Sequence, residues 1–394
     1  MHSTEWMKNY RKKCRKAINE FKKVVKENKY LNDSMNTMIK EIPHKIDKHC
    51  DDNYKGYTIT EHNKKPKNFD EVCKRFYSVI THAPKFYDPL NPFNGLPVID
   101  LFAKLIASDT GLLFFGNIVI NNHMKKILDL WSGFLMRPES ASVLTKNGWL
   151  GMSSMDEFKH NKNKKHYGFR SWNDFFIREF KDIDKSRPMS DALVVSACDA
   201  IYVAFKKNIK YSTDFMRVKG DIYSLKDMLF NVPDNIVKKF VGGCIYQAYL
   251  SAETYHRYHS PVEGKLVHAD VVDGSLFLVN NFYDTNENKF CGQDQVMKSQ
   301  QFLPNVQTRG ICIFKTKEIG YVGFIAIGMT EVSSCIIYDN LLNKVVKKGQ
   351  EIGHFQYGGS SHLLIFEKKY MNKLKFSINR KTLTKLRSKI ACLK

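Results

Sequence analysis

The sequence lacks the features that mark a secreted, membrane-spanning or disulfide-stabilised protein. Its nine cysteines include no C-x-x-C pair and no regular spacing, which favours reduced thiols over a disulfide framework. The most apolar stretch, residues 111–120, is about half as long as a membrane-spanning helix requires. The first residues lack the apolar core of a signal peptide. These absences predict a cytoplasmic protein whose contact with a membrane is at most peripheral.

Acidic residues are scarce relative to basic ones. There are 62 Lys and Arg against 40 Asp and Glu, a formal net charge of +22. The excess is concentrated in residues 8–30, 158–166 and the segment from 368 onward. Such a balance favours polyanionic surroundings, for example an anionic membrane surface, nucleic acid or acidic substrates. No basic motif with interleaved aromatics typical of a nucleic-acid-binding module is present, so we expect no nucleic-acid partner.

The length of the chain and the pattern of its apolar residues predict two regions. At 394 residues, 43% hydrophobic and 26% charged, the chain can bury a large core and carry an accessory region. Residues 1–180 show mostly helical periodicity, whereas from about 190 short apolar runs alternate with Gly, Asp and Asn, as in strands. We therefore predict an α+β protein in which a helical N-terminal region, 1–180, packs on a β-rich domain, 181–394.

Local patterns in the N-terminal region predict particular helices. Apolar residues between Met7 and Val25 recur every three or four positions, with lysines between them. A solvated basic face on a packed helix is the favoured interpretation, and peripheral binding to an anionic membrane is the alternative. Asn68 followed by Glu71 is a capping-box-like start for a helix over 69–80.

Two histidines lie close together in the β-rich region. His256 and His259 are three residues apart, directly before Pro261. Such a pair can bind a metal, act as acid and base, or cap strand ends. Zinc needs further ligands at suitable spacing, and no Cys or Glu cluster supplies them, so we expect no metal. Asp199 ends an apolar run, where a carboxylate is usually a turn residue unless a histidine needs orienting.

Four small residues, 358–361 (Gly-Gly-Ser-Ser), interrupt an apolar run near the end of the chain. Taken alone, they favour a β-bulge or a turn. The alternative is self-processing, because a serine hydroxyl can attack the preceding carbonyl when a base removes its proton. Glycine permits the strained backbone that such an attack needs, and a histidine held by a carboxylate would activate the hydroxyl. Spacing alone does not bring Asp199, the histidine pair and Ser360 together.

Several motifs, in their order along the chain, resemble the phosphatidylserine decarboxylase family. The helical N-terminal part, the segment 240–261 and the doubled glycine are most similar to its soluble branch, the L-tryptophan decarboxylases. The matching motifs are "SWNDFFIREF" (171–180), "RP" (187–188), "YHRYHSPVEG" (255–264), "IGMTEVSSC" (327–335) and "VVKKGQEIGHFQYGGSS" (345–361).

The resemblance implies a pyruvoyl enzyme made by self-cleavage between residues 359 and 360. By motif match, Ser360 would attack the carbonyl of Gly359, His259 would be the base and Asp199 would orient it. His256 would serve decarboxylation or substrate binding. The resulting chains, 1–359 and 360–394, would stay associated. Ser360 would become the pyruvoyl group, whose ketone binds the amine of the substrate and withdraws electrons as carbon dioxide leaves.

The sequence departs from the family pattern at the proposed carboxylate. The usual Pro-Ala-Asp-Gly turn here reads Ala197-Cys198-Asp199-Ala200, which makes the role of Asp199 less secure than those of the serine and the histidines. Ser361 stands where threonine is common, and Tyr357-Gly358 replaces the usual leucine before a single glycine.

The substrate is expected to be an amine-bearing carboxylic acid. The family as a whole implies conversion of phosphatidylserine to phosphatidylethanolamine, and the soluble branch implies a free aromatic amino acid such as L-tryptophan. The pocket residues that would decide between them cannot be placed from the sequence. A third hypothesis is a non-catalytic carrier or binding module of lipoyl-like β fold, because "VVKKGQEIG" (345–353) resembles the strand-turn of such domains. No lysine in a carrier context supports it.

Overall fold

The computed structural model describes most of the chain. The described residues are 2–42, 64–86, 94–106, 109–213, 222–277, 283–284, 289–290, 300–329, 331, 334–357, 360–380 and 382–394. Gly358 and Gly359 therefore lie outside them, and with them the carbonyl at the expected cleavage point. Within these ranges, no helix combines the length and the hydropathy needed to cross a membrane.

The chain forms an α+β structure of two compact units. Unit 1 comprises residues 1–156, 160–176 and 275–299, and unit 2 comprises 157–159, 177–274 and 300–394. Helices dominate unit 1 and antiparallel strands dominate unit 2, as the α+β class requires. The two units are not separated by a single boundary at 180/181. Residues 275–299 belong to the helical unit, and residues 177–180 belong to the unit with the strands.

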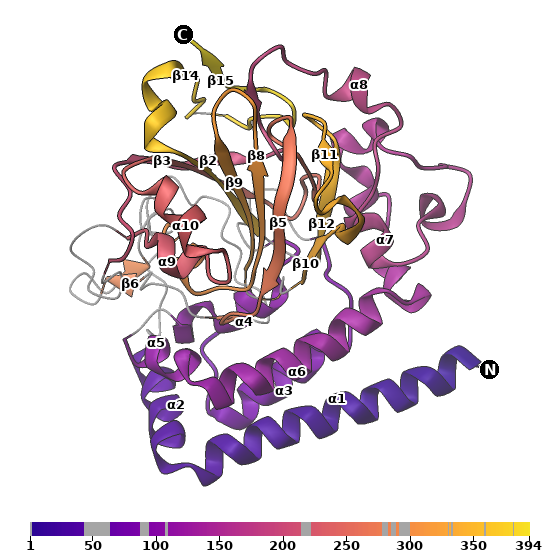
Figure 1. The fold of residues 1–394 in the computed structure, drawn as a ribbon. Helices are drawn as coiled ribbons and strands as arrows, with labels where there is room; N and C mark the ends of the chain where they lie inside the picture. Colours follow the sequence, from indigo (N-terminus) through magenta and orange to yellow (C-terminus); the bar gives the residue numbers. More distant parts are fainter. Residues whose placement is uncertain are drawn as a thin grey trace. The chain divides into compact units, whose positions relative to one another are not determined.

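Unit 1 is built from amphipathic helices that bury one face each. The long helix α1 runs beside α3 and α6 (Figure 1). Its buried residues include Tyr10, Cys14 and Phe21, while its lysines face solvent, as the packed-helix interpretation predicts. The Asn68 side chain accepts a hydrogen bond from Glu71 N at 3.0 Å and begins α3. The helices of this unit are α1 His2–Glu27, α2 Lys29–Glu41, α3 Phe69–Ile80, α4 Pro97–Ile106, α5 Asp109–Gly116, α6 Ile118–Leu135 and α7 Trp172–Phe176; two short strands, β6 Tyr283–Asp284 and β7 Lys289–Phe290, pair with each other.

Unit 2 contains three antiparallel sheets, with strand orders β11-β5-β8-β9-β13-β3-β2, β10-β12-β4 and β1-β15-β14. The strands are β1 Val194–Val195, β2 Ile201–Lys207, β3 Cys244–Leu250, β4 Arg257–His259, β5 Gly264–Val272, β8 Arg309–Lys315, β9 Tyr321–Gly328, β10 Ser334–Ile337, β11 Val345–Val346, β12 Glu351–Gln356, β13 Ser360–Phe366, β14 Leu374–Phe376 and β15 Lys389–Leu393. Three short helices accompany them, α8 Ile183–Ser186, α9 Leu225–Met228 and α10 Asp234–Val237.

The strand β13 lies inside the seven-stranded sheet and is buried along its whole length. It pairs with β9 on one side and β3 on the other, from Ser360 to Phe366. One face of this sheet is covered by the sheet β10-β12-β4, because the ring of Phe324 on β9 lies 5.2 Å from that of Tyr258 on β4. The segment that carries Ser360 is therefore held in the core of unit 2.

Candidate active site

Ser360 is the first residue of β13, and its side chain is completely buried. Strand alternation places Ser360 and His362 on the same face as Phe324, toward the sheet β10-β12-β4. The Ser360 Oγ atom has no hydrogen-bond partner in the described part of the chain. An unpaired buried hydroxyl costs about 1–3 kcal/mol of stability.

The next residue is held firmly on the opposite face of the strand. The Ser361 hydroxyl donates to Ala248 O at 3.0 Å and accepts from the Gln247 amide at 3.2 Å. That amide also donates to Gln300 O at 2.7 Å, and its oxygen accepts from the Tyr223 hydroxyl at 2.6 Å. All of Gln247's amide hydrogens are used. The network fixes the start of β13 while leaving the Ser360 hydroxyl unpaired.

Backbone strain lies directly before the expected cleavage point. Tyr357 follows β12, is buried and has φ 56°, in the left-handed region that bulky residues rarely adopt. Such a conformation costs of order 1–3 kcal/mol and persists only where the surrounding fold imposes it. Glu331 is also buried, and together with burial its charge raises the pKa of the Tyr357 phenol. The strained residue is thus three positions from Ser360.

His259 is buried with both ring nitrogens engaged. Nδ1 lies 2.9 Å from Gly349 O and Nε2 lies 3.1 Å from the Tyr255 hydroxyl. Because a carbonyl only accepts, Nδ1 carries the proton and Nε2 accepts from Tyr255. Burial lowers the pKa of His259 to about 4, so the imidazole is neutral at pH 7. A neutral imidazole can act as a base, but here its lone pair is occupied by Tyr255.

The two histidines of the pair lie beside different residues of the neighbouring strand β12. His259 pairs with Glu351 at the beginning of that strand. The carbonyl of His256 accepts from Phe355 N at 2.9 Å, near the end of the strand that leads to residue 360. His256 is fully buried. The register therefore places His256 closer than His259, along β12, to the segment with Ser360.

Asp199 makes its contacts with an arginine instead of a histidine. Its carboxylate accepts from Arg187 at 2.8, 3.1 and 2.6 Å and from Leu386 N at 2.7 Å. Both charged side chains are almost completely buried. No hydrogen bond joins Asp199 to His259, although both are described, so the expected orienting contact is not formed in this structure. Arg187 belongs to the Arg-Pro motif of the sequence, and the contact gives that motif a structural role.

His362 is a buried residue near Ser360 that the sequence reasoning missed. Neither ring nitrogen has a hydrogen-bond partner among the described residues, and the ring lies 6.0 Å from that of Phe324. Burial lowers the pKa of His362 to about 3. The signal that could have found it is strand alternation, which puts residues 360 and 362 on one face. Gln247 and Glu331 gave no comparable signal in the sequence.

The described residues contain no group of three or more His, Cys, Asp or Glu side chains arranged to hold a metal ion. The polar side chains at the start of β13 are instead the hydroxyls of Ser360 and Ser361, the imidazole of His362 and the amide of Gln247.

Comparison with known proteins identifies the family. The family model described as "Phosphatidylserine decarboxylase" matches residues 172–391, more than half of the chain and most of unit 2. The chain belongs to the phosphatidylserine decarboxylase family. A second model, likewise described as a decarboxylase of phosphatidylserine, matches residues 15–158. The matches thus extend over the helical part as well.

Individual members of the phosphatidylserine decarboxylase family and its tryptophan branch show the same relationship. L-tryptophan decarboxylase of Psilocybe cubensis is 32% identical over 76% of this chain and 73% of that protein. Decarboxylase iboD of Amanita muscaria is 33% identical over 70% of this chain and 84% of its own length. The phosphatidylserine decarboxylase proenzyme of Fusobacterium nucleatum is 30% identical over 64% of this chain and 78% of its own length.

These relatives make the protein an enzyme of the carboxy-lyase class and support the tryptophan decarboxylase-like branch. The non-catalytic carrier hypothesis is therefore wrong.

Proposed function

We propose that the chain is a self-processing, pyruvoyl-dependent decarboxylase that converts phosphatidylserine to phosphatidylethanolamine and carbon dioxide. The observation that supports the self-processing step is the buried Ser360 hydroxyl at the start of a central strand, which has no hydrogen-bond partner among the described residues. The strained Tyr357 supports it. Family membership supports the reaction class and the lipid substrate.

In the proposed maturation, the Ser360 oxygen attacks the carbonyl of Gly359. The bond from that carbonyl carbon to the Ser360 nitrogen breaks, and the hydroxyl proton ends on the nitrogen, which leaves an ester. Elimination then releases the 1–359 chain as a carboxylate, and hydrolysis of the remaining enamine gives ammonia and a pyruvoyl group on 360–394. That group, when present, supplies a ketone that binds the substrate amine and accepts the electrons left by carbon dioxide.

The imidazoles would move the protons in both stages. His259 is the proposed base for self-cleavage, with Nε2 as the basic atom. Because Nε2 accepts from the Tyr255 hydroxyl, the proton must pass through Tyr255 or that contact must open. His256 is the proposed proton donor after decarboxylation, supported by its position near the end of β12. Asp199 would act indirectly, by holding Arg187 at the beginning of the β-rich domain.

The two chains produced by cleavage would stay together. The 360–394 chain would contain β13, which pairs over its seven residues with β9 and with β3, both from the 1–359 chain. Two ladders of backbone hydrogen bonds and a buried strand face would keep the 360–394 chain bound to the 1–359 chain. We place the protein in the cytoplasm, in peripheral contact with an anionic membrane when it meets a lipid substrate.

A free aromatic amino acid is the second candidate substrate. The observation that favours it is the extent of similarity: L-tryptophan decarboxylase of P. cubensis aligns with 76% of this chain, whereas the F. nucleatum proenzyme aligns with 64%. The described structure does not show which residues would bind an indole or a lipid headgroup.

Intact-mass spectrometry of the purified protein tests the maturation. We expect a 1–359 chain and a 360–394 chain that carries a pyruvoyl group and reacts with hydroxylamine. Ser360→Ala should give one uncut chain without activity, because the attacking oxygen is gone, while the matched control Ser361→Ala should still be cut, although more slowly, because it keeps that oxygen. An uncut wild-type chain without a reactive carbonyl under any condition would overturn the proposal.

The substrate is tested on the same preparation. Carbon dioxide is trapped during incubation with phosphatidylserine vesicles and, separately, with L-tryptophan. Release from the vesicles alone supports the lipid substrate. Release from L-tryptophan alone eliminates it in favour of the free amino acid.

A further inference from the structure

A second site of unit 2 lies away from Ser360. A cavity of about 970 Å³ opens beside the hairpin that joins β8 to β9, the start of β5 and the strand β15. Lys315 and Lys265 are paired across β8 and β5, and Phe366 lies at the same end of the sheet. Ser360 begins β13 and Phe366 ends it, so the two ends are about 20 Å apart along the strand.

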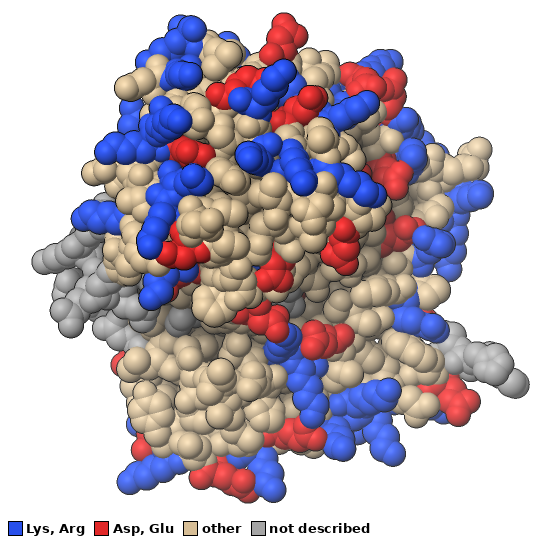
Figure 2. All heavy atoms as spheres, viewed as in Figure 1, with Lys and Arg blue, Asp and Glu red and all other residues tan. Residues whose placement is uncertain are grey.

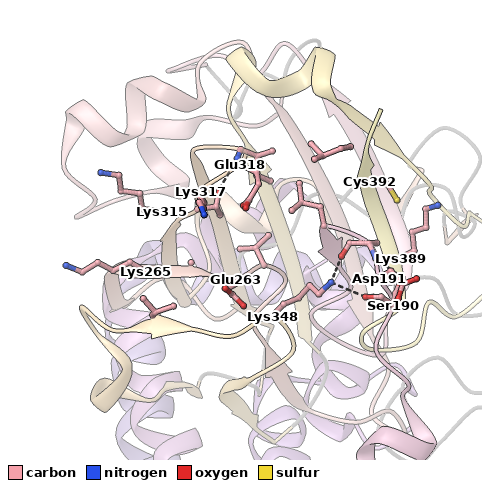
Figure 3. Close-up of a pocket in the computed structure, with 18 residues that line it drawn as sticks. Ser190, Asp191, Glu263, Lys265, Lys315, Lys317, Glu318, Lys348, Lys389 and Cys392 are labelled. Carbon is pink, nitrogen blue, oxygen red and sulfur yellow. Dashed lines mark hydrogen bonds between the residues drawn. The ribbon is translucent and has the colours of Figure 1, made fainter.

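The cavity is rimmed by lysines from four separate segments of the chain. In Figure 3, Lys265, Lys315 and Lys317 lie on one side of it, Lys389 lies on the other, and Lys348 lies between them. Four of the five are exposed. Lys265, Lys315, Lys317 and Lys389 have no carboxylate partner among the residues that the structure describes.

Lys348 differs from the other four in being held in place. Its ammonium group donates to Ser190 O at 3.0 Å and to Ala192 O at 2.5 Å (Figure 3). Both acceptors are neutral carbonyls, so the positive charge is oriented but not neutralised. It follows Lys347 in a tight turn whose Gly349 has φ 75°. This turn fixes one cation at the cavity before any ligand arrives.

The remaining lining sets the chemistry of the ligand. Three carboxylates, Asp191, Glu263 and Glu318, also face the cavity, so five cations outnumber them by two. The apolar side chains of Val345 and Leu393 stay exposed at its rim, by 68% and 50%. A dianionic group with a short apolar or polyol part matches both features. Figure 2 shows basic and acidic side chains interspersed over the visible face, so net charge alone does not single out this position.

The geometry points to this lysine-rimmed cavity as a binding site for a phosphate ester, separate from the Ser360 site. A phosphate monoester carries close to two negative charges at pH 7, which the excess of lysine compensates. The same phosphate monoester occurs in soluble esters and in the headgroup of phosphatidic acid. Because most of the lysines are exposed, the binding should weaken as salt is added. The inference does not depend on the proposed self-cleavage.

The test uses the full-length protein with two probes. Glycerol 3-phosphate is titrated by calorimetry, and vesicles of phosphatidic acid in phosphatidylcholine are sedimented with the protein. The cavity variant is Lys315→Glu with Lys317→Glu. The matched control is Lys206→Glu with Lys207→Glu, two exposed lysines of β2 at the other edge of the sheet. Thermal melting and the gel pattern of the chain confirm that both variants fold.

We expect the cavity variant to bind at least tenfold more weakly than the wild type, and the control to stay within twofold of it. Loss with glycerol 3-phosphate identifies a soluble ester as the ligand. Loss confined to phosphatidic acid vesicles identifies a lipid headgroup. Equal weakening in both variants would show that net charge alone attracts the anion and would overturn the site, as would no binding of either probe to the wild type.

Discussion

The two ends of the seven-stranded sheet carry opposite kinds of polar group. At the Ser360 end, among the described residues, the buried Ser360 hydroxyl has no hydrogen-bond partner and the buried Arg309 donates to backbone carbonyls. At the Phe366 end, five lysines line the cavity and four of them are exposed to solvent. Burial of unpaired polar groups costs stability and is retained where chemistry needs it, whereas exposed charges cost little. The first end suits reaction and the second suits binding.

The largest expected effects come from replacing one histidine at a time, which tests whether the Ser360 end of the sheet is the reactive end. His259→Ala should block self-cleavage, because it removes the proposed base, and both chains should then run as one band on a denaturing gel. His256→Ala should still be cut but should release carbon dioxide at least tenfold more slowly. His354→Ala, which removes a half-buried histidine of β12, is the control. Normal maturation of His259→Ala would reassign the base to another group, and His256 would be the next candidate.

A large loss of stability is expected when Asp199 loses its charge. Asp199→Asn leaves the buried Arg187 with Glu157 as its remaining carboxylate partner among the described residues, so the loss should stay below the about 3–5 kcal/mol that breaking a buried ion pair outright costs. Chemical denaturation in a Ser360→Ala background measures this without interference from cleavage. Arg187→Met combined with Asp199→Asn should recover part of the loss. Unchanged stability, with cleavage abolished in the Ser360-containing protein, would instead favour a direct role of Asp199 in catalysis.

A moderate effect on cleavage rate is expected at the network behind Ser360. Gln247→Leu and Ser361→Ala each remove the hydrogen bond between these two residues, so each should slow the appearance of the 360–394 chain several-fold. The double variant should be little slower than either single one, because the shared contact is already lost. Hydroxylamine distinguishes the step, since it cleaves an accumulated ester but does not speed its formation. Additive effects in the double variant would contradict the network.

The smallest expected effect is an increase in stability. His362→Leu replaces a buried imidazole that has no hydrogen bond by an apolar side chain, and should raise stability by roughly 1 kcal/mol at pH 7. Cleavage should continue, because His362 has no proposed role in it. The measurement is the denaturation midpoint in the Ser360→Ala background. Loss of cleavage in an otherwise stable His362→Leu protein would place this histidine in the reaction.

The same histidine contributes to acid sensitivity. Its pKa is lowered to about 3 in the folded protein, and the unfolded chain binds the proton near pH 6.5. The stabilising contribution is therefore complete above pH 6.5 and is lost as pH falls toward 3, by about 1.4 kcal/mol per pH unit. His259 and His354, both lowered to about 4, act in the same direction. His362→Leu should make the loss between pH 6 and 4 shallower by one such contribution, and an unchanged slope would contradict the burial argument.

Local patterns in the sequence predicted much of this molecule. The spacing of apolar residues predicted α1, Asn68 predicted the start of α3, and the order of motifs predicted the family. The role of Ser360 stays a prediction. These features are encoded within a few residues or in motif order, so they do not require knowledge of the fold.

The tertiary structure determined which residues distant in the sequence contact each other. Asp199 meets Leu386, which is 187 positions away, and Lys348 meets the carbonyls of Ser190 and Ala192. Strand register places His256 and His259 at different points of β12, and it leaves His362 buried beside Ser360. Pairing of distant strands depends on the packing of the whole core, and no short stretch of sequence contains that information.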